Sequence, residues 1–274
     1  MPEASQVLVY SKTSLQIDGI RPSRPRALYF SEDYYLGWVQ GGDIEIISFD
    51  PKIGPIFYTL SVPDKDSVKT PRMTRSRDCM GCHGSSRTNH VPGMLVRSMY
   101  TDVRGFPTFS AGSFRTTPAS PLKERWGGWY VTGTHAGERH MGNLLYSEPT
   151  HDDATLHKVR DLGVDLETLD EVLDVKPYLK NTSDIVALMV MEHQIAAHNA
   201  LIKAAMTTQR VLHRDRELAK YWDDSTNKAM SDTSRRVIGH QADQLLEVLL
   251  FKDEIELEGW GVEGSEAFQQ AFGA

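Results

Sequence analysis

Cysteine is scarce in this sequence, and its two copies, Cys79 and Cys82, lie three positions apart. Such a pair cannot join distant parts of a fold, which excludes a framework of structural disulfides. A redox pair, a metal site and a haem are the remaining reasons for placing two cysteines so close together.

Other absences narrow the function further. No run approaches the ~18 apolar residues of a spanning helix, so we expect no membrane-spanning segment. A formal net charge of −7 gives no reason to expect nucleic-acid binding. The opening MPEASQVLVYSKTS lacks the basic start and apolar core of a secretory signal. No G-x-G-x-x-G, phosphate-loop, G-x-S-x-G or H-E-x-x-H pattern occurs, so the usual nucleotide-binding and hydrolase motifs are missing.

The first half of the chain is predicted to be antiparallel β structure. Short β-branched and aromatic runs alternate with turn residues, and Gly41, Gly42 and Asp43 are typical of a hairpin turn. The predicted strands cover 27–30, 34–40, 44–49, 55–62, 94–101, 106–114 and 127–133. The flanks of the cysteines, 70–78 and 84–93, are predicted to be loops.

From about residue 151 the pattern becomes helical. A polar cap at 181–183 precedes a long segment without Gly or Pro that ends near Trp222, and 234–254 forms a second helix. The two helices should pack as an antiparallel hairpin. We therefore predict an α+β fold, with a β-rich part at 1–149 that carries the cysteines and a helical part at 150–274 with an acidic tail.

The stretch CMGCH, from Cys79 to His83, fits the C-x-x-C-H pattern of covalent haem attachment. Two thiols on neighbouring turns reach the two vinyl groups of one porphyrin, and the imidazole that follows becomes the proximal iron ligand. A thioredoxin-like pair would follow a strand in a βαβ unit. A structural zinc site would need two distant histidines besides Cys79 and Cys82. A chance pair of cysteines is a further alternative; we favour one covalent haem c.

Through CMGCH and the small residues Gly81 and Gly84, the chain resembles the c-type cytochromes. The motif follows a long β-rich segment, so the fold of a small soluble cytochrome c is not expected. The resemblance implies that Cys79 and Cys82 anchor the haem and that His83 binds its iron. The whole chain is similar to large exported single-haem bacterial proteins of unassigned function. Haem attachment outside the cytoplasm implies a periplasmic protein, whose export signal this sequence would then lack.

The sixth iron ligand would decide between an electron carrier and an open iron site. Our candidates, in order, are His140, His135, His198 and Met141. His135, His140 and Met141 lie in the Gly-rich segment 125–143, and its residues Trp126 and Trp129 could line a haem pocket. The alternative for this segment is an aromatic-rich strand with surface histidines.

The long helix carries two polar residues within an apolar stripe, Glu192 and Asn199, and a buried carboxylate needs a partner. Either an arginine from the β part or His193 could pair with the Glu192 carboxylate. Like His193, His198 is expected at a packed interface, where it could be a hydrogen-bonded core histidine rather than a ligand.

A basic run surrounds the cysteines in this acidic chain, made of Lys69, Arg72, Arg75, Arg77 and Arg87. Guanidinium groups pair well with carboxylates, so we predict that Arg72, Arg75 or Arg77 holds a haem propionate. The alternative is a solvated charged loop.

The leading functional hypothesis is electron transfer to a redox partner protein. The second is a haem-c oxidoreductase or gas sensor with an open distal site, acting on a small-molecule oxidant or ligand. The third is a zinc protein that uses Cys79 and Cys82. No catalytic residue is identified from the sequence.

Overall fold

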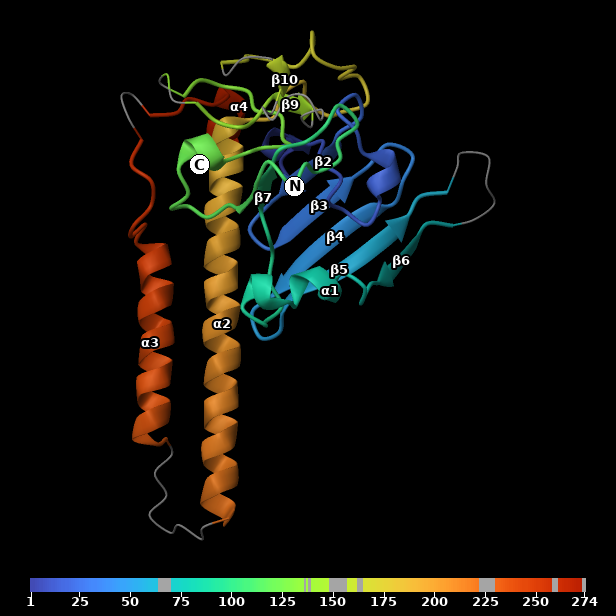
Figure 1. Cartoon of the computed structure of the whole chain (residues 1–274). Coiled ribbons are helices and arrows are strands. Elements are labelled where there is room, and N and C mark those ends of the chain that lie inside the picture. The colour runs from blue at the N-terminus through green and yellow to red at the C-terminus, as the bar shows by residue number, and fades with distance from the viewer. Residues whose placement is uncertain are drawn as a thin grey trace.

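The computed structural model describes residues 1–63, 70–135, 137, 139–147, 157–161, 165–221, 230–257 and 261–272. They form the predicted α+β fold, in which a twisted sheet packs against one long helix, α2 (Ile185–Tyr221) (Figure 1). The C-x-x-C-H motif includes a short helix, α1 (Met80–His83), beside this sheet.

The main sheet is an antiparallel meander in which strands consecutive in sequence are also neighbours in space. Its strands are β1 (Val7–Val9), β2 (Arg26–Phe30), β3 (Tyr34–Trp38), β4 (Ile44–Asp50), β5 (Gly54–Ser61) and β6 (Arg72–Arg75). The predicted hairpin turn between β3 and β4 is confirmed, and Gly41 there adopts a φ of +74° that favours glycine. Strand β6 occupies a segment predicted to be loop, because its pairing with β5 outweighs its polar sequence.

Two smaller sheets complete the β structure of the described residues. Strand β7 (Arg97–Met99) pairs with β8 (Ser113–Arg115), and β9 (Leu144–Ser147) pairs with β10 (His157–Asp161). The prediction of a strand at 127–133 is wrong. Gly128 and Gly133 both have positive φ angles, which interrupt an extended run, and the segment makes isolated bridges instead.

The predicted helical hairpin is confirmed. Helix α3 (Asp232–Leu249) runs antiparallel to α2 (Figure 1), and α4 (Glu266–Phe272) follows near the C-terminus. The Ser231 hydroxyl caps α3 by accepting a hydrogen bond from the Ser234 backbone N–H. By length and composition alone, α2 is long and apolar enough to cross a membrane. Its most apolar 18 residues have a mean hydropathy of 1.3, and 44% of them are buried inside the protein.

One hydrophobic core joins the sheet to the first half of α2. Inward-facing side chains of the sheet, such as Phe30 and Phe49, pack with Leu188 and Ile202 of the helix. The same face of the sheet also carries α1, because Phe57 of β5 contacts His83. The fold therefore places the C-x-x-C-H motif and the middle of α2 on one sheet face.

Candidate functional site

A single helical turn brings Cys79, Cys82 and His83 of the C-x-x-C-H motif onto one side. Cys79 is the N-cap of α1, with φ −56° and ψ −30°, and Cys82 and His83 follow three and four residues later. Residues at these spacings share a face of a helix. Both thiols are free, with Cys82 exposed and Cys79 half-buried. The turn thus presents two thiols and one imidazole to the same space.

His83 is clamped to Gly93 at two points. The imidazole Nδ1 lies 2.8 Å from the carbonyl oxygen of Gly93, and the Gly93 N–H donates to the His83 carbonyl at 2.8 Å. A carbonyl can only accept, so Nδ1 carries the proton and Nε2 keeps its lone pair. Among the described residues, Nε2 has no hydrogen-bond partner. Metal-ligating histidines are usually held in this way.

Helix α2 fixes the loop that clamps His83. The Asn199 Oδ1 accepts from the Met94 backbone N–H at 2.8 Å, and its Nδ2 donates to the Met94 carbonyl at 2.9 Å. A Cβ added to Gly93 would meet Asn199 Oδ1 at 2.8 Å and the Thr88 side chain at 3.1 Å. Asn199, which interrupts the apolar stripe of α2, thus positions the backbone that orients the imidazole.

The surroundings of His83 keep its imidazole neutral. Its ring packs on Phe57, with the ring centres 4.7 Å apart. Burial lowers the pKa of His83, the hydrogen bond to the Gly93 carbonyl opposes this, and the charge of Arg26 lowers the pKa further. A neutral imidazole at pH 7 is the form that binds iron.

The arginines predicted to hold propionates lie on the surface near the motif. Arg72, Arg75 and Arg77 are exposed and form no ion pair with any described residue. Arg72 and Arg75 extend from β6, and Lys69 lies outside the described residues.

Sequence reasoning missed two other arginines beside the cysteines. Arg26 forms an ion pair with Glu45, its buried Nε has no hydrogen-bond partner, and it interacts electrostatically with Cys79. Arg97 interacts in the same way with Cys82. The signal for Arg26 was its place on β2, where it shares the inward face with Phe30.

The histidine pair predicted to supply a distal ligand is buried rather than on the surface. His135 and His140 are 1% and 4% exposed, and their ring centres lie 4.9 Å apart. Trp126 packs on His140 at 5.3 Å and donates from Nε1 to Glu192 at 3.0 Å. Glu192 precedes Asn199 by seven residues, about 10 Å along α2. Trp126 and His140 are therefore attached to α2 about two turns away from Asn199, which fixes the loop that holds His83.

The other predicted residues of that segment also lie in the protein interior. Trp129 is buried and donates from Nε1 to the Arg97 carbonyl at 2.8 Å. The Met141 sulfur accepts from the Ser98 hydroxyl at 3.6 Å. Both side chains thus have partners within the packed interior of the protein.

His198 lies on the same sheet face as His83. Its ring stacks on Phe49 at 3.9 Å, and its Nδ1 is 3.1 Å from the Tyr35 hydroxyl. Phe49 and Phe57 are diagonal neighbours on β4 and β5, since Phe49 pairs with Pro55. Of the four candidates for the distal ligand, His198 is the one that packs on a phenylalanine next to the one that contacts His83.

The predicted partner of Glu192 is an arginine of the β part. Arg125 donates from Nη1 to Glu192 at 2.9 Å, and both side chains are almost fully buried. Burial raises the pKa of Glu192 to about 7, although Arg125 and the Trp126 hydrogen bond oppose this rise. His193 instead contacts Glu254, with 2.5 Å between Nδ1 and Oε1.

No family model, curated protein or solved structure matches the chain. The interpretation of the site therefore depends on its own residues.

Those residues fit a covalent haem c. The two thiols are free to form thioethers, and the His83 Nε2 retains its lone pair. A Cβ added to Gly81, in the middle of the motif, would meet no atom within 4 Å, which shows open space there. The unpartnered Arg26 Nε is a donor that a propionate oxygen would satisfy.

Proposed function

We propose that this chain is a periplasmic mono-haem c-type protein that transfers electrons. Cys79 and Cys82 hold the haem through thioethers, and His83 binds the iron through Nε2. The observation that carries the proposal is the clamp between His83 Nδ1 and the Gly93 carbonyl, next to two free thiols on the same helical face. When bound, the haem supplies a one-electron cycle between ferric and ferrous iron.

The protein's own residues suit a carrier. The exposed position of Cys82 sets the group it holds near the surface, where a partner can come close. The exposed arginines near the motif, which include Arg75 and Arg77, have no carboxylate partner among the described residues. Such unpaired surface charge steers an acidic redox partner and raises its rate of association.

One observation favours a second function, a haem-c enzyme or gas sensor with an open distal site. His135, His140 and Met141 are buried. Trp126, which packs on His140, is hydrogen-bonded to α2 at Glu192, two turns away from Asn199. An iron held by His83 without a ligand from this group would keep a free position for peroxide or a gas.

The zinc alternative gains no support. Among the residues that the structure describes, no group of three or more His, Cys, Asp or Glu side chains could hold a metal ion.

The decisive experiment is expression with haem-maturation machinery, followed by acid–acetone extraction. The parent should keep its colour, whereas the double variant Cys79→Ser/Cys82→Ser should release all of it. Ser86→Ala, an exposed change in the adjacent loop, is the matched control and should behave as the parent. A parent without colour, or one that loses all colour on extraction, would contradict the proposal. A low-spin spectrum that carbon monoxide barely changes supports the carrier, and rapid carbon monoxide binding supports the open site.

A further inference from the structure

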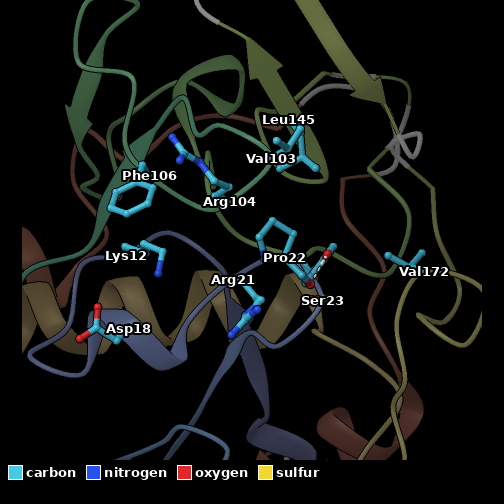
Figure 2. A pocket seen from close by; sticks show the side chains of 11 residues that line it. Lys12, Asp18, Arg21, Pro22, Ser23, Val103, Arg104, Phe106, Leu145 and Val172 are labelled. Carbon is cyan, nitrogen blue, oxygen red and sulfur yellow. Dashed lines mark hydrogen bonds between the residues drawn. The ribbon is translucent and has the colours of Figure 1, made fainter.

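A cleft of about 710 Å³ lies on loops that do not carry the haem motif (Figure 2). One wall comes from the loop after β1 and the turn around Pro22, and the other comes from the loop 102–106 after β7. Its volume falls within the range of small-molecule sites. Neither the sequence motifs nor the proposed electron transfer gives this cleft a role.

The rim of the cleft is cationic around an exposed aromatic ring. Lys12 Nζ lies 4.9 Å from the ring centre of Phe106, and the Arg104 guanidinium lies 5.2 Å from it. Figure 2 shows both cations beside this ring, and Arg21 lines the same cleft lower in the view. Phe106 is 45% exposed, so one aromatic surface is open to a ligand.

The rim is built before any ligand arrives. The Asp102 Oδ1 accepts backbone hydrogen bonds from Arg104 and Phe106, both at 2.8 Å. Gly105 has a φ of +86°, and a Cβ there would collide with the Tyr10 carbonyl. The Lys12 N–H then donates to the Gly105 carbonyl at 2.8 Å. These bonds join the loop that presents Arg104 and Phe106 to the segment that presents Lys12.

The charges of the cleft are incompletely balanced. Lys12 and Arg21 have no carboxylate partner among the described residues, whereas Arg104 pairs with Asp102 at 3.3 Å. Asp18 is the one carboxylate among the described residues that line the cleft. The excess of positive charge favours an anion.

The floor is apolar. Tyr130 and Leu145 line it and are 3% and 7% exposed. The Tyr130 hydroxyl already donates to the Pro22 carbonyl at 2.8 Å, so the tyrosine offers mainly its ring. An apolar floor below a cationic rim suits a molecule with both characters.

We propose that this cleft binds a small amphiphilic organic anion, whose apolar body lies on Tyr130 and Leu145 and whose carboxylate meets Lys12 and Arg21. The contact with the charged rim should weaken in salt, whereas the contact with the floor should not.

The test uses two probes of the same shape, 1-naphthoate and its neutral amide, with the full chain in isothermal titration calorimetry. Naphthoate should bind about tenfold more tightly than the amide, which corresponds to one well-placed charge contact. Lys12→Gln/Arg21→Gln should remove this difference and leave amide binding unchanged. Lys123→Gln, an exposed lysine outside the cleft, is the matched control.

Arg21→Gln alone serves as a second variant, since the side chain of Arg21 makes no hydrogen bond among the described residues. It should weaken naphthoate binding severalfold with an unchanged circular dichroism spectrum. Equal binding of the two probes, no binding of naphthoate, or full naphthoate affinity in the folded variants would each overturn the proposal.

Discussion

His83 and Gly93 are joined by two hydrogen bonds of 2.8 Å, one from the imidazole and one from the backbone. The next peptide along the chain is held by Asn199 of α2. The orientation of the proposed iron ligand therefore depends on a helix that is more than 100 residues away in sequence, as the Met94–Asn199 separation of 105 shows.

Asn199→Ala should alter the orientation of the His83 imidazole although Asn199 makes no direct hydrogen bond to it. The variant loses two hydrogen bonds and leaves the Met94 peptide without its partners, so we expect the free energy of unfolding to fall by about 2–3 kcal/mol. The loosened Gly93 carbonyl should also change the iron–histidine stretching band in resonance Raman spectra of the ferrous protein. Lys203→Ala, which removes an exposed contact of the same helix with Asn89, should change neither quantity. An unchanged Raman band in a folded variant would contradict this positioning role.

Gly93→Ala should destabilise the protein by about 1–3 kcal/mol, because the new methyl group meets Asn199 and Thr88. Part of this cost should disappear when Asn199→Ala is already present, since the smaller side chain makes room. A double-mutant cycle in urea measures the coupling between the two positions. Strict additivity would show that the two residues do not share this space.

Glu192 should make stability depend on pH. Its folded-state pKa of about 7 lies above the ordinary value of 4.5, so the folded protein holds a proton there more tightly than the unfolded chain. The associated stability is fully present below pH 4.5 and is lost as the pH rises through 7, with a total of about 3 kcal/mol. Denaturant titrations of the parent and Glu192→Gln from pH 4.5 to 8 should therefore differ in slope, with the parent losing more stability. Parallel pH profiles would show that the carboxylate is charged throughout.

His140→Ala should leave the visible spectrum of the haem protein unchanged, because its neighbour Trp126 is hydrogen-bonded to Glu192, two turns of α2 away from Asn199. The loss of its buried ring contacts should still lower the free energy of unfolding, by about 1–3 kcal/mol. His198→Ala is the informative comparison, since His198 packs on the same sheet face as His83. Conversion from a low-spin to a high-spin spectrum in either variant identifies that histidine as the distal ligand.

Local patterns predicted much of the fold. The strands predicted at 27–30, 34–40, 44–49 and 55–62, the turn at Gly41 and the long segment without Gly or Pro each depend on neighbours in sequence, and the structure confirms them. The predicted strand 106–114 is extended only at its end, in β8. The segment 127–133 has a strand-like composition, but the positive φ angles of Gly128 and Gly133 prevent a continuous strand. No local pattern reports such backbone angles.

The site was predictable where its residues are adjacent and not where they converge through the fold. CMGCH could be read directly, because its chemistry needs residues that are three and four positions apart. The roles of Gly93 and Asn199 depend on a contact between a loop and a distant helix. Arg26 reaches the motif across the sheet, so that its charge shifts the pKa of His83. Sequence order carries no information on these distances.

Helix α2 has 37 residues, which corresponds to a length of about 55 Å. Its first half is built into the core up to Ile202, whereas its last turns, ending at Tyr221, extend along α3 away from the sheet (Figure 1). Because α2 is one continuous helix anchored in the core, a movement at the far end of the hairpin would be transmitted to Asn199. From Asn199 it would reach the Gly93 carbonyl and then the imidazole of His83. The proposed iron ligand is thus mechanically connected to a part of the molecule about 33 Å away along the helix axis.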